Sequence, residues 1–582
     1  MRRTAVVAIL AGGALLAMLP LLRLPAFYES ILYLALHWIV LATSWNILSG
    51  YSGYFSFGHG AFFGAGVYAT AVLAGKFDWP FLATLPVAAA VATALGLALG
   101  AVVFRVRAVR GELFALLTLA VTFVLATIVL NTSIDGGPGV YLSAVPVPRI
   151  APTQPGTFYL LALAAAVLAL LAAYLVQHSK LGVGLFAIHD DEDAAEVMGV
   201  PTFRYKLAAL AISCALAGLA GGVHAVFISY VTTGEVFSIT VPLTVVLMSV
   251  LGGTRHWAGP AVGATVITAL LYAFTKGDLA LTGKATTGAV LIAAILFMPQ
   301  GIVPRLLQRS PIPRRATARP NAVAAATSRA PAIATPSGAV LLRATGVAKS
   351  FAGVQALAGV DIEVRSGEIL GLIGPNGSGK STFINVVSGH YPTSAGSIEF
   401  DGREIAGLPA HRIARSGIAR TYQIPRPFAH LSVRDNVAAA AMFGGAALST
   451  ARARIEAEHW LEFTGLAAKA DVLPDALNLH QRKFLELARA LASRPRLVLL
   501  DEVLCGLNPS EIDEAVGLIR RIRDAGSTVI FVEHVMRAVL ALSDRIVVLN
   551  HGLLLAEGPA AQVLQRPDVM TAYLGTMHAA RA

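Results

Sequence analysis

The chain has 582 residues, of which 56% are hydrophobic and only 14% are charged. An ordinary soluble protein has about a quarter charged residues, so the composition excludes that class and indicates a membrane protein. The net charge of +11 does not indicate nucleic-acid binding, because the excess of basic over acidic residues lies mainly in the loops between apolar runs and in a linker, where membrane topology explains it. Cys214 and Cys505 lie in very different surroundings and predict neither a disulfide framework nor a metal site.

Long apolar runs fill the first half of the chain. A membrane span needs about 20 mostly apolar residues, and about ten spans are predicted, the run with Pro242 being the weakest. Arg2 and Arg3 predict an N-terminus on the inner side, which puts the polar segment 131–156 outside. A cleaved signal peptide is disfavoured, because no small-residue cleavage site follows the first run. The predicted spans are 4–22, 31–49, 60–75, 79–104, 112–130, 157–177, 207–230, 239–251, 258–275 and 280–298.

A change of composition divides the chain. Residues 308–340 are rich in Ala, Pro, Ser and Arg without apolar periodicity, so they cannot bury enough surface to offset chain entropy. We therefore expect a membrane domain at 1–307, a flexible linker at 308–340 and a soluble domain at 341–582.

The soluble domain contains a complete phosphate-binding loop. Residues 369–381 read ILGLIGPNGSGKS, a short apolar strand followed by the pattern GxxxxGKS, and a helix begins at Thr382. Its glycines allow a tight turn whose N–H groups converge on a β-phosphate, Lys380 reaches the β/γ oxygens, and Ser381 ligates Mg²⁺. The pattern predicts a nucleoside triphosphate and Mg²⁺ as ligands. The predicted loop residues are Gly374, Pro375, Asn376, Gly377, Ser378, Gly379, Lys380, Ser381 and Thr382.

Two further strands end in catalytic residue types. Residues 496–502 read RLVLLDE, a buried strand that places Asp501 in the Mg²⁺ shell and Glu502 beside it to polarise the attacking water. Residues 527–534 read STVIFVEH, and His534 at the end of that strand is a candidate sensor of the γ-phosphate.

These motifs resemble the nucleotide-binding domain of ABC transporters over roughly 341–577, and the family resemblance implies that the nucleotide is ATP. The resemblance implies that Phe351 in KSFAGVQAL stacks on adenine and that Gln423 in ARTYQIPRPF contacts Mg²⁺ and the membrane domain. It also implies that Glu502 is the catalytic glutamate and His534 the switch histidine. The forms CGLNPSE and RTYQ are similar to those of the branched-chain and hydrophobic amino acid uptake subgroup.

The membrane half is similar to the permeases of the same subgroup. Five segments carry the resemblance in order, and the one at 181–222 includes a charged loop that resembles the coupling helix, which docks on the ATPase near Gln423. The implied fold is a polytopic α-helical membrane domain fused to an α/β P-loop ABC ATPase domain. The segments are WNILSGYSGYFSFGHGAFFGAGVYA (45–69), DGGPGV (135–140), LGVGLFAIHDDEDAAEVMGVPTFRYKLAALAISCALAGLAGG (181–222), VLGGTRHWAGPAVGA (250–264) and MPQGIVPR (298–305).

The resemblance implies an importer in a bacterial inner membrane with its ATPase domain in the cytoplasm. It needs a second permease–ATPase half and an extracytoplasmic solute-binding protein. Branched-chain amino acids lead as the solute, with aromatic acids, amides and urea as alternatives. An exporter is disfavoured because exporter halves have about six long spans, and a non-hydrolysing regulatory subunit is disfavoured because it has no need of Glu502.

The signature segment departs from the family pattern. LSGGQ or LSYGQ is expected before a helix, and residues 477–481 read LNLHQ. Asn478 and Gln481 can still form hydrogen bonds to the nucleotide on the opposite ATPase, but His480 replaces a glycine where a side chain obstructs close approach of backbone to phosphate. We therefore expect an asymmetric dimer, in which this chain pairs with a different half.

One intramembrane histidine has two open interpretations. His59 lies between glycines in FSFGHG, and a polar ring is costly in lipid. Either it closes a glycine-rich break between helices by a hydrogen bond or it lines the solute path.

Overall fold

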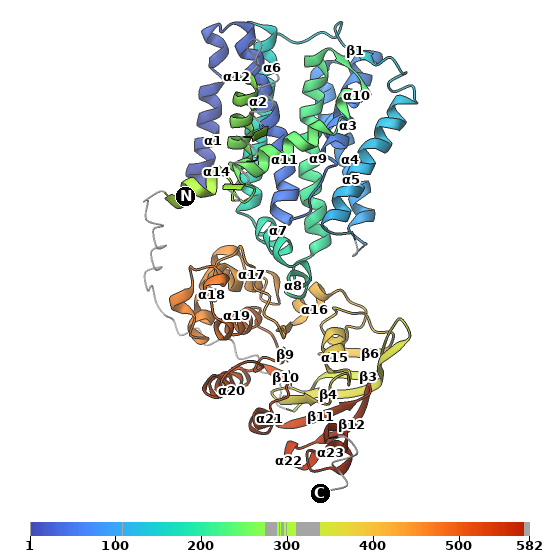
Figure 1. The fold of residues 1–582 in the computed structure, drawn as a ribbon, viewed down its shortest axis with the longest axis vertical. Helices are drawn as coiled ribbons and strands as arrows, with labels where there is room; N and C mark the ends of the chain where they lie inside the picture. The colour runs from blue at the N-terminus through green and yellow to red at the C-terminus, as the bar shows by residue number, and fades with distance from the viewer. Residues whose placement is uncertain are drawn as a thin grey trace. The chain divides into compact units, whose positions relative to one another are not determined.

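The computed structural model describes residues 2–106, 109–273, 288–289, 292, 296–297, 300–309 and 338–574. Two compact units divide them, drawn in Figure 1. The first unit contains the described residues up to His189 and from Phe203 to Arg309; the second contains Asp190–Thr202 and everything from residue 338 onward. A segment of 13 residues from the predicted membrane domain is therefore part of the second unit. Most of the predicted linker lies outside the described residues.

The first unit is helical. Seven of its described helical segments are long and apolar enough to cross a membrane. The glycine-rich helix α3 (His59–Lys76) and the shorter α12 (Gly259–Ala273) correspond to two further predicted spans, while 280–298 lies largely outside the described residues. The count is therefore roughly as predicted. The seven segments are Thr4–Leu22, Ala26–Gly50, Phe81–Val103, Glu112–Leu130, Gln154–Gln177, Thr202–Ile228 and Thr233–Gly252.

The described α-helices of this unit are joined by short elements. Its described helices are α1 (Arg2–Leu16), α2 (Ala26–Trp45), α3, α4 (Phe81–Val103), α5 (Glu112–Leu130), α6 (Gln154–Gln177), α7 (Lys180–Asp190), α9 (Thr202–Ile228), α10 (Thr233–Val236), α11 (Thr240–Gly252), α12 and α14 (Ile302–Arg309). A π-helical turn, Asn46–Gly50, extends α2. Strands β1 (Val140–Tyr141) and β2 (Tyr230–Val231) form an antiparallel pair.

Small residues let the central helices of the first unit approach closely. A Cβ at Gly66 of α3 would lie 2.2 Å from the carbonyl oxygen of Gly218 on α9, and one at Gly96 of α4 would lie 2.3 Å from Cys214 Sγ. Close contact between small residues is a principal source of helix association in lipid, where no hydrophobic driving force remains.

The second unit contains two sheets. The six-stranded sheet has the order β12-β11-β5-β10-β9-β8, and within it β11, β5, β10, β9 and β8 are parallel. The four-stranded sheet β4-β3-β6-β7 is antiparallel. The strands are β3 (Val340–Phe351), β4 (Val354–Arg365), β5 (Ile369–Ile373), β6 (Ala395–Phe400), β7 (Arg403–Glu404), β8 (Ile418–Arg420), β9 (Leu497–Asp501), β10 (Thr528–Val532), β11 (Arg545–Asn550) and β12 (Leu553–Gly558).

Burial explains the strand pattern. Every residue of β5, β9 and β10 is buried, as expected of parallel strands covered on both faces. The three predicted strands at 369, 496 and 527 are thus confirmed and lie side by side, so their carboxyl ends meet at one edge. The helices are α8 (Glu192–Val197), α15 (Lys380–Val387), α16 (Ala410–Ser416), α17 (Val433–Phe443), α18 (Thr450–Phe463), α19 (Leu479–Ala492), α20 (Pro509–Asp524), α21 (Met536–Leu542), α22 (Ala560–Val563) and α23 (Pro567–Leu574).

Candidate functional site

The predicted phosphate loop connects β5 to α15. Gly374 and Gly379 both have positive φ values, 150° and 103°, and neither has room for a side chain. A Cβ at Gly374 would lie 2.1 Å from the carbonyl oxygen of Leu549, and one at Gly379 would lie 2.6 Å from that of Ala356. Lys380 Nζ donates to the carbonyl oxygens of Gly374 at 2.8 Å and Pro375 at 2.9 Å. The lysine ammonium is thereby held against the loop, and burial lowers its pKa.

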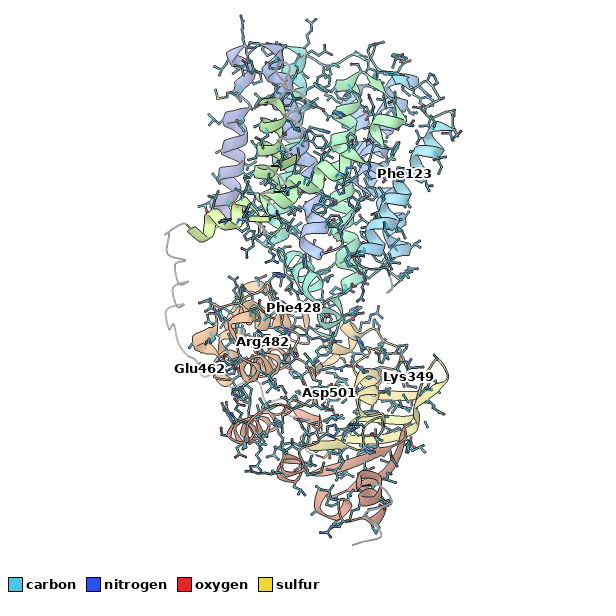
Figure 2. All side chains as sticks on the ribbon, viewed as in Figure 1. Phe123, Lys349, Phe428, Glu462, Arg482 and Asp501 are labelled. Carbon is cyan, nitrogen blue, oxygen red and sulfur yellow. The ribbon has the colours of Figure 1, made fainter. Side chains whose placement is uncertain are left out.

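A buried carboxylate, that of Asp501, lines the same cavity as Ser381 at the end of this loop. Asp501, labelled in Figure 2, ends β9 and is 5% exposed. Burial raises the pKa of its carboxyl, which Arg420, 3.5 Å away, partly offsets. Ser381, Gln423 and Asp501 line one cavity of about 250 Å³. The end of the phosphate loop, the Gln423 segment and the end of β9 therefore line one common cavity.

Three predicted site residues meet at Glu502. Gln423 Nε2 donates to Glu502 Oε2 at 2.5 Å, and His534 Nε2 lies 3.0 Å from Glu502 Oε1. Glu502 has a φ of 48°, a left-handed conformation uncommon for a residue other than glycine. Its carboxylate is thereby turned toward the two partners and held by both.

Sequence analysis missed the two side chains that hold the Glu502–Cys505 loop. Lys483 of α19 donates to the carbonyl oxygens of Val503, at 2.9 Å, and Cys505. Glu533 Oε1 accepts from the Leu504 N–H at 2.7 Å, and burial raises the pKa of Glu533 to about 7. The dipeptide Glu533-His534 at a strand end was a usable sequence signal for Glu533. No sequence pattern indicates Lys483, because the groups that it binds are backbone carbonyls.

Arg420 is a second residue that the sequence did not single out. Its guanidinium donates to Asn385 Oδ1 at 2.5 Å and to Ser388 Oγ at 3.1 Å, besides facing Asp501. It thus joins β8 to the helix after the phosphate loop. The pairing of β8 with β9 puts it there.

Phe351 packs against Tyr391, which lines the same cavity as Ser381, Gln423 and Asp501. It ends β3 and is 37% exposed; Tyr391 packs edge-on against its ring at 5.1 Å, and Lys349 Nζ lies 4.9 Å from the ring centre. One ring surface is thus available for stacking.

The signature segment begins a helix instead of forming a loop. Asn478 is the N-cap of α19, accepting from the Gln481 N–H at 2.8 Å, while Gln481 Oε1 accepts from the Asn478 N–H at 3.3 Å. The His480 ring packs on Phe484 with centroids 4.1 Å apart, and its Nε2 lies 3.6 Å from Glu514 Oε2. Leu479 and His480 form the first turn of α19, because the capping box fixes the start of the helix at Asn478.

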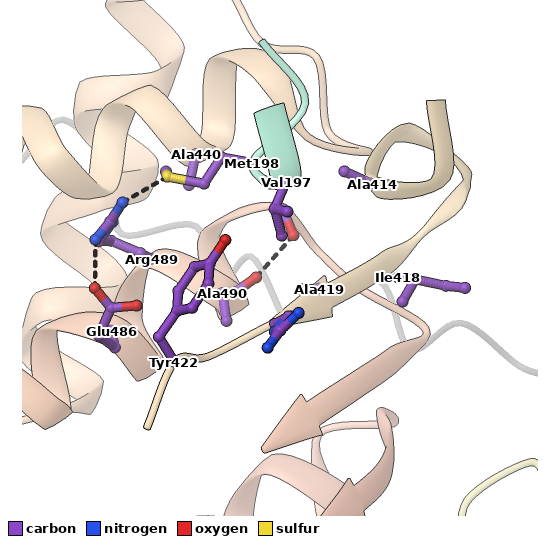
Figure 3. Close-up of a pocket in the computed structure, with 12 residues that line it drawn as sticks. Val197, Met198, Ala414, Ile418, Ala419, Tyr422, Ala440, Glu486, Arg489 and Ala490 are labelled. Atoms are coloured by element: carbon purple, nitrogen blue, oxygen red, sulfur yellow. Dashed lines mark hydrogen bonds and ion pairs between the residues drawn. The ribbon is translucent and has the colours of Figure 1, made fainter. Parts of the chain in front are cut away.

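The segment 190–202 packs within the second unit. Asp191 caps α8 and pairs with Arg426 at 3.1 Å, and Asp190 accepts from the backbone N–H of His430 at 3.0 Å and contacts its ring. At the other end of α8, Arg489 contacts Met198 at 2.7 Å and pairs with Glu486 beside a small cavity, shown in Figure 3. The charged loop is therefore a docked helix.

Two family models match the chain. The one described as branched-chain amino acid transport system / permease component matches residues 27–298, and the one described as ABC transporter matches residues 357–504. The branched-chain amino acid transport ATP-binding protein BraF of Pseudomonas aeruginosa is 39% identical over 249 residues, which cover 40% of this chain and 98% of BraF. The chain belongs to the ABC transporters.

Two further comparisons concern the ATPase part of this ABC transporter. The lipopolysaccharide export system ATP-binding protein LptB of Escherichia coli is 36% identical over 234 residues, covering 40% of this chain and 97% of LptB. A solved nucleotide-free ATP-binding cassette from an ABC transporter is 29% identical, with a TM-score of 0.38, and covers 41% of this chain and all of that one. The family matches and the likeness to BraF give the chain a permease part and an ABC ATPase part whose ATP hydrolysis is coupled to transport.

Proposed function

We propose that the chain imports branched-chain or related hydrophobic amino acids across a bacterial inner membrane as a fused permease–ATPase half-transporter. The supporting observation is the branched-chain permease match over 27–298 in the same chain as a cassette similar to BraF. The cassette alone does not identify the solute, because its likeness to LptB is nearly as high. The permease match argues for amino acids ahead of aromatic acids, amides or urea.

We assign the nucleotide contacts to the predicted residues. Gly374, Asn376, Gly377 and Gly379 supply the loop backbone, Lys380 binds the β/γ oxygens and Phe351 stacks on adenine. Ser378 is assigned to the phosphate loop as well, because its side chain is 1% exposed and its Oγ has no hydrogen-bond partner among the described residues. Oxygen ligands suit Mg²⁺, and the Ser381 hydroxyl, the Asp501 carboxylate and the Gln423 amide oxygen would hold it; when bound, it neutralises phosphate charge.

Hydrolysis depends on Glu502. Its carboxylate accepts the proton of the attacking water, and Gln423 and His534 keep it oriented. Binding-protein-stimulated ATPase of the reconstituted complex, measured with leucine uptake, tests the proposal. Glu502→Gln should abolish both without weakening ATP binding. Stimulated ATPase without uptake of any of the proposed solutes would contradict import.

We propose that the second half is a different chain. His480 occupies the first turn of α19, where glycine would expose backbone N–H groups to the partner's nucleotide. A homodimer would put this obstruction at both sites. His480→Gly should leave ATPase and transport nearly unchanged if the active site uses the partner's signature; a large gain in turnover, or a fully active homodimer of this chain, would refute the asymmetric arrangement.

A further inference from the structure

One face of α2 is polar and buried. Glu29, Tyr33, His37 and Ser44 are 2%, 0%, 4% and 0% exposed. At about 100° per residue, these four positions fall within an arc of about 80°. From Glu29 to Ser44 the helix rises about 22 Å, most of the roughly 30 Å hydrocarbon thickness. We call these four residues the α2 stripe.

Helix α9 presents a matching face to the stripe. Ser213 and His224 are eleven positions apart, a rotation of only about 20° from the same side of the helix. His224 Nδ1 lies 3.0 Å from Tyr33 Oη, and its ring stacks on that of His37 with centroids 4.4 Å apart. Tyr33, His37 and His224 contact one another, and Glu29 lies one turn before Tyr33 on the same face of α2. We call these four residues the outer cluster, because they lie on the side predicted to face outward.

Ser44, His59 and Ser213 form a second polar group, which we call the inner cluster. His59, at the start of α3, has its Nε2 3.1 Å from Ser44 Oγ and 3.4 Å from Ser213 Oγ. His59 therefore does bond across the break between α2 and α3, and it also lies at the inner end of the α2 stripe. Both interpretations of this residue fit one arrangement.

The two clusters are incompletely satisfied. Glu29 Oε2 accepts from Thr153 Oγ1, while Glu29 Oε1 and His59 Nδ1 have no hydrogen-bond partner among the described residues. A buried polar atom without a hydrogen-bond partner destabilises the folded state, and a charged one does so more strongly. Packing alone gives no reason to retain such groups within a membrane, where ionisable residues by default mark a solute or ion path.

Aromatic rings surround the outer cluster. The ring centroid of Phe227 lies 3.9 Å from that of Tyr33, and that of Phe158 lies 6.2 Å away. Phe63 packs on both histidines at 5.6 Å. The site thus combines a carboxylate, two imidazoles and a phenol with an apolar wall, which is the pattern that a zwitterion with an apolar side chain requires.

We propose that the outer cluster is the permease's binding site for the charged end of an α-amino acid. Glu29 pairs with the α-ammonium group, His224 Nδ1–H donates to Tyr33 Oη, Tyr33 and His37 donate to the α-carboxylate, and the phenylalanines receive the apolar side chain. The inner cluster is the next group of polar side chains along the proposed solute path. This inference rests on the proposed import of hydrophobic amino acids and assigns the residues that contact the solute.

The test uses the complete transporter with its partner half and binding protein in proteoliposomes, with radiolabelled L-leucine as probe. Glu29→Gln removes only the charge and should lower uptake per ATP hydrolysed about tenfold, the consequence of losing one charge-assisted hydrogen bond. Stimulated ATPase and the unfolding temperature should stay near wild type. Tyr33→Phe keeps the ring and should lower uptake severalfold, and Glu29→Asp should restore part of it. Glu112→Gln, an exposed acid at the start of α5, is the matched control and should change nothing.

The outcomes separate this inference from the proposed function. If the wild-type complex transports neither leucine nor any other of the proposed amino acids, the proposed solute fails, and the outer cluster fails with it as an amino acid site. If it transports one of them, and Glu29→Gln and Tyr33→Phe both transport normally, the outer cluster is not the site. If both variants lose stimulated ATPase and unfolding temperature in proportion to uptake, the cluster is structural and the inference is overturned.

Discussion

Glu533 allows a quantitative test of how burial sets the electrostatics of the ATPase site. Its side chain is 3% exposed, and burial raises its pKa from the ordinary 4.5 to about 7. Because the folded-state pKa lies above the unfolded one, the stabilisation from its protonated form is fully present below about pH 4.5 and is lost as the pH rises through about 7. Above pH 7 the ionised carboxyl costs at most about 3 kcal/mol.

Glu533→Gln should remove this pH dependence. Glutamine keeps an acceptor for the Leu504 N–H and never ionises, so the variant should be more stable than wild type at pH 8.5 by about 1–3 kcal/mol. The difference should shrink by about 1–2 kcal/mol on lowering the pH to 5.5, where most of the wild-type carboxyl is already protonated.

Amide hydrogen exchange of β9 and β10 peptides in the full-length chain measures this difference. Comparing variant and wild type at the same pH cancels the intrinsic exchange rate, and exchange through opening of these core strands reports the free energy of that opening. Glu462→Gln, an exposed acid on α18, is the control. Parallel pH profiles for Glu533→Gln and wild type would refute the argument from burial.

Three further substitutions test contacts that position the catalytic loop and the segment 190–202 within the second unit. Lys483→Met should destabilise the cassette by about 3 kcal/mol, because it leaves buried carbonyls unpaired, and should lower ATPase activity about 10–100-fold by displacing Glu502. Hydrogen exchange and ATPase assays measure the two effects, and normal ATPase activity would contradict a role of Lys483 in positioning Glu502. Gly199→Ala should leave ATPase active but uncouple uptake, since its Cβ would lie 2.2 Å from a backbone oxygen of α17; coupled uptake would count against this. Asp191→Arg should uncouple as well and be rescued by Arg426→Asp, and failure of that rescue would show that their ion pair is incidental.

The phosphate loop and the acid strands could be predicted because each is local. Strand, turn and helix follow one another within a dozen residues, so the pattern around Lys380 contains nearly all the information needed. The convergence of Gln423 and His534 on Glu502 was suggested only by family resemblance. It depends on the pairing of β9 with β8 and β10, which is not local.

The missed residues have non-local or backbone partners. Arg420 faces Asp501 only because β8 pairs with β9, and Lys483 bonds to carbonyls that any sequence would supply. In the membrane half, average hydropathy concealed the α2 stripe: Glu29 and His37 are single polar residues in an apolar run, and only their spacing at multiples of a helical turn, with Tyr33 between them, marks a common face.

Helix α19 connects the separate tasks of the cassette. Its N-terminal turn carries the altered signature at Asn478 and His480, Lys483 holds the loop after Glu502, and Arg489 lies against Met198 beside α8. From His480 to Arg489 the helix spans about 13 Å, and a single helix moves as a rigid rod over that length. A displacement of the signature turn would therefore also displace Lys483 at the catalytic loop and Arg489 at α8. Under the proposed pairing of two halves, the substitution at His480 therefore affects more than one phosphate contact, because His480 lies in the turn that begins this helix.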